Sequence, residues 1–134
     1  ANAYKEGLSS DEILITADTI VCLENEILGK PKNYEEAFSM LSSLSGKQHK
    51  VITGVTILST KKAHSFSSVT DVWFKVIPKN ELDYYIRNYE PFDKAGAYGI
   101  QEWIGLTCIE RIEGSYFNVV GLPIQKLFEA LKRF

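Results

Sequence analysis

The sequence is poor in cysteine, histidine and proline, with two, two and four residues of each type in 134. Cys22 and Cys108 lie far apart and form no C-x-x-C pair, which excludes a disulfide framework and a zinc knuckle. We expect both to be buried thiols of a protein in a reducing compartment. His49 and His64 have no partner at metal-ligand spacing, so we expect them on the surface of strands.

A strong charge of one sign is also absent. The 15 Lys and Arg residues nearly balance 17 Asp and Glu residues, for a formal net charge of -2, so no global field favours a nucleic-acid polymer. No apolar run approaches the ~20 residues that a membrane span needs. Residues 1–11 are polar and lack the basic and apolar parts of a signal peptide. These absences predict a cytoplasmic protein that binds neither membranes nor nucleic-acid polymers.

The composition is that of an ordinary globular protein. Hydrophobic residues make up 45% of the chain and charged residues 24%, which predicts one packed domain over residues 1–134. Residues 1–6 have the character of the middle of a helix, entered without a cap or an initiator Met. We therefore expect the domain to be incomplete at its N-terminus.

Short runs of apolar and β-branched residues predict the strands. The first run is continuous, which is typical of a strand buried on both faces, and the following segments predict a hairpin and a long antiparallel pair. The expected strands are residues 13–16, a hairpin over 20–28 with its tip at 24–26, the pair 49–59 and 66–77, and two later strands at 106–112 and 117–120.

Apolar residues at helical spacing predict three helices. Asn33 caps the first, and Gly46 follows its end. Asn80 is expected to cap the second, which Pro91 stops, and Pro123 occupies the first position of the third. This order of strands and helices predicts an α/β fold, a mixed twisted sheet flanked by helices.

Two charged residues are candidates for chemistry. Asp18 follows the first predicted strand, where ligand-binding groups collect in open α/β sheets, and its carboxylate suits a general base or a metal ligand. Asp18 with Thr19 is equally suited to turning the chain. Lys30 lies between Gly29 and Pro31, which fix the local backbone, so its ammonium can face a phosphate or remain a solvated loop group.

The stretch 93–101 is the third candidate. It combines Lys94, glycines that allow close backbone approach, and Gln101, whose amide can pair with a base edge. Gly54 within a predicted strand indicates a bulge or a ligand pressed against the backbone. Four aromatic residues could stack on a base, although we expect most of them in the core: Trp73, Trp103, Tyr116 and Phe117. These patterns predict an anionic-ligand site without naming its reaction.

Six motifs follow one another along nearly the whole chain: Ala17-Asp18-Thr19, Leu28-Gly29-Lys30-Pro31, Leu44-Ser45-Gly46-Lys47, Thr53-Gly54-Val55, the stretch 93–101 and the stretch 110–123. In this order they resemble the Maf family of nucleoside triphosphate pyrophosphatases. The resemblance implies a fold related to inosine triphosphate pyrophosphatases and a cytoplasmic homodimer. It also implies a divalent cation, Mg²⁺ or Mn²⁺, and hydrolysis of a nucleoside triphosphate to the monophosphate and pyrophosphate.

The resemblance also assigns roles to residues. Asp18 matches the family's catalytic Asp and would bind the metal, and Lys30, with Lys94, would neutralise phosphate oxygens. Thr19 and Gln101 would read the base, as in the subfamily that acts on dTTP and UTP. Such an enzyme would have a house-cleaning role, the removal of unwanted nucleotides from the cellular pool.

One family motif is missing from the sequence. The family begins with a strand and a Ser-x-Ser-Pro-Arg-Arg loop that binds phosphates, and this chain contains no such loop. A second hypothesis therefore stays open, namely a nucleotide-binding regulator of septum formation without catalysis. A purely structural domain explains less, because it gives no reason for Asp18, Lys30 and Gln101 to occur together.

Overall fold

The computed structural model describes residues 7–134, so the helical character expected for residues 1–6 lies outside the described part. Five strands form one sheet in the order β2-β1-β3-β4-β5, and each neighbouring pair is antiparallel. The strands are β1 (Leu14–Leu23), β2 (Glu26–Leu28), β3 (Gln48–Leu58), β4 (Ala63–Phe74) and β5 (Ile109–Glu113). The helices are α1 (Tyr34–Leu44), α2 (Lys79–Tyr89), the 3-10 turn η2 (Ala95–Ala97), α3 (Trp103–Cys108), α4 (Tyr116–Val120) and α5 (Ile124–Arg133).

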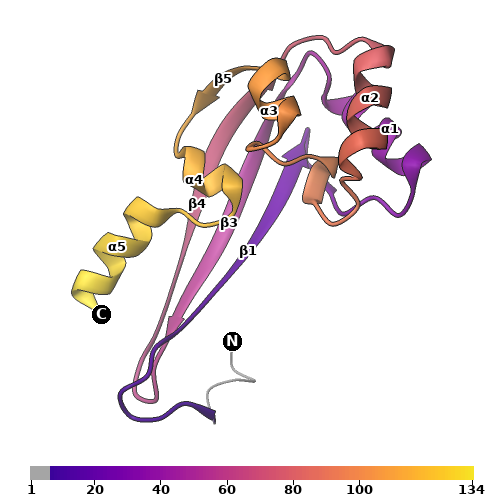
Figure 1. Ribbon diagram of the computed structural model, residues 1–134. Coiled ribbons are helices and arrows are strands. Elements are labelled where there is room, and N and C mark those ends of the chain that lie inside the picture. The colour runs from indigo at the N-terminus through magenta and orange to yellow at the C-terminus, as the bar shows by residue number, and fades with distance from the viewer. Residues whose placement is uncertain (1–6) are drawn as a thin grey trace.

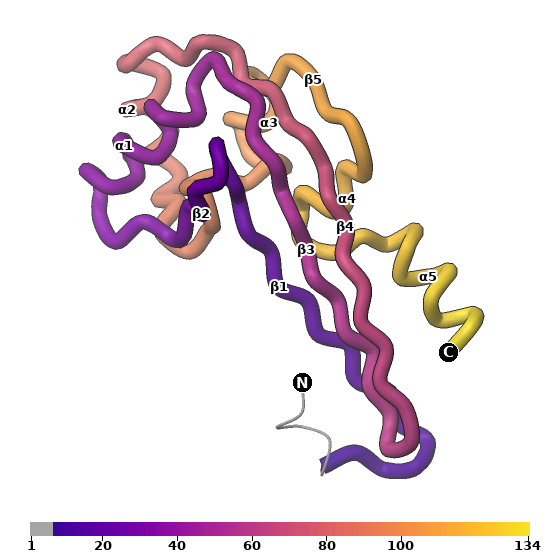
Figure 2. Tube along the Cα trace, turned by 180° about the vertical axis from the view of Figure 1, so that it is seen from behind, coloured from indigo at the N-terminus to yellow at the C-terminus, as the bar shows by residue number. Residues whose placement is uncertain are grey.

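Strands β1, β3 and β4 form a long ribbon, with α1, α2 and α3 gathered at one end and α5 farther along it (Figure 1). Figure 2 shows the same separation from behind. The larger core cluster joins the sheet to α1 and α2, and a smaller one joins Val55 and Ile57 of β3 to Leu127 and Ala130 of α5. The predicted α/β fold with a sheet flanked by helices is confirmed, but the sheet of residues 7–134 is antiparallel throughout and not mixed. Within residues 7–134, no helix combines the length and the apolar character that crossing a bilayer requires.

Local signals identified several elements correctly. Asn33 caps α1, where its side-chain oxygen accepts a hydrogen bond from the Glu36 N–H at 2.9 Å, and Gly46 follows the helix with a left-handed φ of 70°. The hairpin between β1 and β2 turns at Glu24 and Asn25, as predicted. The long antiparallel pair is β3 with β4, which runs from the Gln48 and Trp73 partners to Leu58 and Ala63.

The first predicted strand was wrong in its extent and its burial. It continues through Asp18 to Leu23, so Asp18 lies within β1 and does not follow it. Ile15 is 38% exposed, because β1 belongs to an antiparallel sheet with one open face rather than to a parallel sheet covered on both. Strand β4 begins at Ala63, three residues before the predicted start, because the Ser59 N–H donates to the Lys62 carbonyl at 2.8 Å and closes a tight turn.

The strand predicted over 106–112 is a helix in its first part. Residues 103–108 form α3, and only 109–113 form β5. The reason is a close approach at Gly105, where a Cβ atom would lie 1.7 Å from the Ile100 carbonyl oxygen. Only glycine allows the chain to turn so tightly against that carbonyl, and the turn leaves the Leu106 side chain 82% exposed.

The strand predicted over 117–120 is the short helix α4. Ser115 caps it by accepting a hydrogen bond from the Asn118 N–H at 3.1 Å. The nitrogen of the fully buried Asn118 amide then lies 3.2 and 3.1 Å from the Val51 and Ser68 carbonyls and 2.9 Å from the Thr70 hydroxyl, three acceptors that share its two N–H groups. These contacts with β3 and β4 outweigh the strand propensity of the valines in α4.

Two helix starts also differ from the prediction. Asn80 does not cap α2, because Pro78 holds the cap position and its carbonyl accepts from the Leu82 N–H at 3.1 Å. Pro123 caps α5 and is followed by the first helical residue, Ile124, a shift of one position. The C-terminal residue of α2 is Tyr89, and the chain leaves the helix before Pro91 as expected.

Three expectations about burial were wrong. His49 is buried, 2% exposed, with its Nε2 atom 2.6 Å from the Tyr98 hydroxyl, whereas His64 is exposed as predicted. Cys108 is buried but Cys22 is only partly buried, and both are free thiols. Most of the four aromatic residues do not lie in the core: Trp73 and Trp103 are partly buried, and Tyr116 and Phe117 are 42% and 56% exposed.

The buried His49 predicts a pH-dependent stability. Burial lowers the pKa of His49 from 6.5 to about 4, against a smaller opposing effect of Asp71. The unfolded chain therefore binds more protons between pH 6.5 and 4, so His49 makes the protein less stable as the pH falls through this window. The expected loss is about 2 to 3 kcal/mol, measured by urea unfolding at a series of pH values.

The comparison that isolates this effect uses His49→Gln, which should unfold with a flatter pH dependence between pH 6.5 and 4. His64→Gln is the control, because an exposed imidazole should leave the pH dependence as in the parent protein. Equal slopes for the parent and His49→Gln would show that His49 does not titrate in this window.

Candidate functional site

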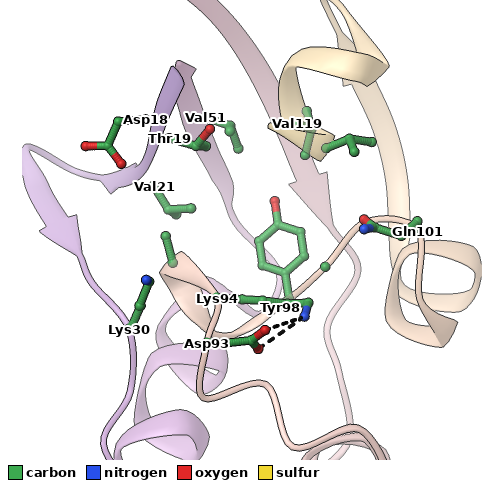
Figure 3. A pocket seen from close by; sticks show the side chains of 13 residues that line it. Asp18, Thr19, Val21, Lys30, Val51, Asp93, Lys94, Tyr98, Gln101 and Val119 are labelled. Atoms are coloured by element: carbon green, nitrogen blue, oxygen red, sulfur yellow. Dashed lines mark hydrogen bonds and ion pairs between the residues drawn. The ribbon is translucent and has the colours of Figure 1, made fainter. Parts of the chain in front are cut away.

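A hollow of about 250 Å³ lies beside β1, and the five residues singled out in the sequence all line it (Figure 3). Asp18 and Thr19 come from β1, Lys30 from the segment after β2, and Lys94 and Gln101 from the stretch around η2. The remaining lining residues are Val21, Val51, Asp93, Ala95, Tyr98, Gly99, Val119 and Val120. Segments far apart in the sequence therefore meet at one place, although their chemical roles stay predictions.

Asp18 and Thr19 both line the hollow although adjacent strand residues point to opposite faces of a sheet. Strand β2 pairs only with Val21–Leu23, so at Asp18 and Thr19 the strand β1 is the edge of the described sheet. The Thr19 hydroxyl lies 2.8 Å from the Thr53 hydroxyl, and the Asp18 side chain is exposed. The hollow follows this edge, which gives a ligand access to both side chains.

Charged groups of both signs line the hollow. The Lys94 ammonium lies 3.2 and 3.4 Å from the two carboxylate oxygens of Asp93. This hydrogen bond, with smaller contributions that include the charge of Lys30, lowers the pKa of Asp93. Figure 3 shows Lys30 on the side of the hollow toward Asp93, away from Gln101. The hollow thus has a charged part, lined by ammonium and carboxylate groups, and, at Gln101, an uncharged amide part.

The glycine-containing loop rests directly on β1. Gly96 has a φ of 69°, and a Cβ atom there would lie 3.0 Å from both methyl carbons of Val21. Its N–H donates to the Gly29 carbonyl at 3.1 Å, which ties this loop to the segment that carries Lys30. The glycine is therefore required for close approach as well as for its left-handed conformation.

Tyr98 provides a largely buried surface at the base of the hollow. It is 6% exposed, its hydroxyl meets the His49 ring nitrogen at 2.6 Å, and its ring contacts Phe74 with centroids 5.0 Å apart. Val119 of α4 also lines the hollow (Figure 3). Burial raises the pKa of Tyr98, so its hydroxyl stays protonated at neutral pH.

The described residues offer few ligands for a metal ion. Residues 7–134 contain no group of three or more His, Cys, Asp or Glu side chains placed to hold one. Asp18 and Asp93 are the carboxylates that line the hollow, and Asp93 is paired with Lys94. Because Mg²⁺ is commonly bound by one or two carboxylates together with substrate phosphates, the exposed Asp18 carboxylate fits this cation as a single protein ligand.

Sequence reasoning missed the parts of the site that depend on the tertiary fold. Tyr98 and Val119 lie in the stretches 93–101 and 110–123 that the sequence singled out, but no local signal marks their side chains as the wall of a pocket rather than ordinary core. Gly54 does not form a bulge, because it pairs in regular register with Asp18 and Ser67. None of the four aromatic residues proposed for base stacking is among the residues that line the hollow.

The chain is similar to known proteins over nearly all of its length. The family model described as Maf-like protein matches residues 1–134. The chain is 53% identical over 133 residues to a protein of Phocaeicola vulgatus named dTTP/UTP pyrophosphatase, covering 99% of this chain and 69% of that protein. A protein of the same name from Porphyromonas gingivalis is 49% identical over 136 residues, covering 100% of this chain and 68% of its own length.

The packing of Gly96 predicts a specific sensitivity. Gly96→Ala should lower the free energy of unfolding by about 1 to 3 kcal/mol. The new methyl group would clash with Val21, and the alanine backbone would have to keep a left-handed conformation. Gly54→Ala is the matched control: a Cβ atom there has no neighbour within 4 Å, so stability should stay equal or rise slightly. Urea unfolding of both variants checks this, and an unchanged midpoint for Gly96→Ala would contradict it.

Proposed function

This chain belongs to the Maf family, and from that premise we propose that it hydrolyses dTTP and UTP to the monophosphate and pyrophosphate. In a cell this activity would remove unwanted nucleotides from the pool. The observation that carries the proposal is that all five motif residues line one hollow, with ammonium and carboxylate groups in one part and an amide in another. The relatives named dTTP/UTP pyrophosphatase support the enzyme over the regulator of septum formation.

Asp18, Lys30 and Lys94 would carry out the chemistry at the phosphates. Water must attack the α-phosphorus while negative charge builds up on the phosphate oxygens and on the leaving pyrophosphate. Lys30 and Lys94 would neutralise this charge, and a triphosphate would compete with Asp93 for Lys94. Asp18 would orient the water or accept its proton.

A divalent cation belongs to the proposal as a cofactor. Bound at Asp18 and the phosphates, Mg²⁺ or Mn²⁺ would supply charge neutralisation at the reacting phosphorus. Asp18 is the residue proposed to hold it, because its carboxylate has no ion pair within residues 7–134. This leaves Lys30 and Lys94 to bind oxygens that the cation does not reach.

The base would bind at Gln101 and Thr19. The N3–H of uracil or thymine is a donor flanked by two carbonyl acceptors, and the Gln101 amide offers the complementary acceptor and donor. The Thr19 hydroxyl, already bonded to Thr53, retains capacity for one more hydrogen bond. A homodimer and a cytoplasmic location complete the proposal by resemblance to the family.

Asp18→Asn tests the proposal directly. We expect turnover of dTTP and UTP to fall by ~10²-fold or more, because an amide cannot accept the proton and binds a cation poorly. The measurement is release of pyrophosphate and monophosphate by the full-length protein with Mg²⁺ or Mn²⁺. The control is Asp71→Asn, which removes a carboxylate of β4 that pairs with Lys50 and does not line the hollow.

Each outcome has a distinct meaning. Near-normal turnover by Asp18→Asn would remove this carboxylate from the reaction. Nucleotide binding by the parent protein without release of pyrophosphate would favour the regulator instead.

A further inference from the structure

A closed ring of hydrogen bonds holds the turn from Gly99 to Glu102. The Gly99 N–H donates to the Tyr85 hydroxyl oxygen at 3.2 Å, and that hydroxyl donates to the Glu102 carboxylate at 2.6 Å. The Glu102 N–H donates back to the Gly99 carbonyl at 3.0 Å. One tyrosine oxygen therefore joins both ends of a four-residue turn.

The tyrosine itself has little freedom to move. Tyr85 is fully buried on α2, and its ring stacks on Tyr89 and Trp103 with centroids 5.2 and 6.5 Å away. Burial and the hydrogen bond to Glu102 raise the pKa of Tyr85, so the hydroxyl keeps the proton that it donates. Because a hydrogen bond to a carboxylate is stronger than a neutral one, the ring fixes Glu102 firmly.

Gln101 lies inside the turn that this ring closes. Its side chain is exposed and lines the hollow, as does Gly99, while Glu102 on its other side is bound to the core through Tyr85. The direction of the Gln101 side chain follows from the backbone of these flanking residues. Its own side-chain amide has no hydrogen bond within residues 7–134 that would orient it independently.

We propose that Tyr85 and Glu102 are positioning residues that aim the Gln101 amide at the base and so set the selectivity for pyrimidine nucleotides. This inference rests on the proposed function, since it concerns how that same site chooses its substrate. Neither residue is among those that line the hollow. A small rotation of the turn would move the amide out of register with the base edge, at a cost to recognition and not to the chemistry at the phosphate.

The test uses Tyr85→Phe, which removes one oxygen and keeps the ring. For dTTP and UTP we expect KM to rise about tenfold with little change in kcat, as for the loss of one well-placed hydrogen bond. Turnover of GTP should change much less, so the preference for pyrimidines should fall. Tyr89→Phe is the matched control, a neighbouring tyrosine on α2 that stacks on Tyr85 and does not line the hollow.

Glu102 provides a conservative rescue. Glu102→Gln keeps an oxygen that accepts from Tyr85 and should keep most of the selectivity, whereas Glu102→Ala should behave as Tyr85→Phe does. In a Gln101→Ala background, Tyr85→Phe should have no further effect on selectivity, because the group that it positions is gone.

The outcomes separate this inference from the proposed function. Suppose that the parent protein hydrolyses dTTP and UTP, but Tyr85→Phe raises KM equally for all nucleotides or only lowers thermal stability. The positioning role is then overturned, and the proposed enzymatic function is retained. Additive effects of Tyr85→Phe and Gln101→Ala on selectivity would overturn it as well. If the parent protein releases no pyrophosphate from any nucleotide, both proposals fall together.

Discussion

The arrangement of the larger core depends on one buried side-chain amide. The Asn118 side-chain nitrogen donates to carbonyls of β3 and β4 and to Thr70, and the backbone carbonyl of Asn118 accepts from the Thr53 hydroxyl at 3.1 Å. Each of these groups is out of reach of water, so a shift of α4 would leave buried acceptors without donors, at about 1 to 3 kcal/mol each. The position of α4 against the sheet is therefore tightly specified.

This constraint extends to the hollow beside β1. Val119 and Val120 follow Asn118 in α4 and line it, and Thr53 links α4 to Thr19 on β1 through two hydroxyls. On the opposite side, the contact of Gly96 with Val21 fixes the loop that carries Lys94 and Gln101. A short helix on β3 and β4 and a glycine-containing loop on β1 are thus both fixed against the same sheet, which explains why residues from distant segments form one site.

The sequence predicted best what is decided locally. The Asn33 cap and the alternation of β3 and β4 depend on neighbouring residues or on a period of two, so they could be recognised without the fold. The stretch from Trp103 to Val120 could not, because its helices depend on the Ile100 carbonyl at Gly105 and on contacts of Asn118 with β3 and β4. In the site, the ordered motifs identified Asp18, Lys30 and Gln101, whereas Tyr85 and Tyr98 matter only through partners that are distant in the sequence.

Strand β1 has a further consequence for the behaviour of the protein in solution. From Leu14 to Ile20 it is paired on one side only within the described residues, and a sheet edge of this kind can add a strand from another molecule. The carboxylate of Asp18 near the middle of the edge opposes this, because two such edges pairing around it would bring two carboxylates together. Within the described residues, the carboxylate that we assign to water and metal thus has a second effect, because it disfavours the pairing of two such edges.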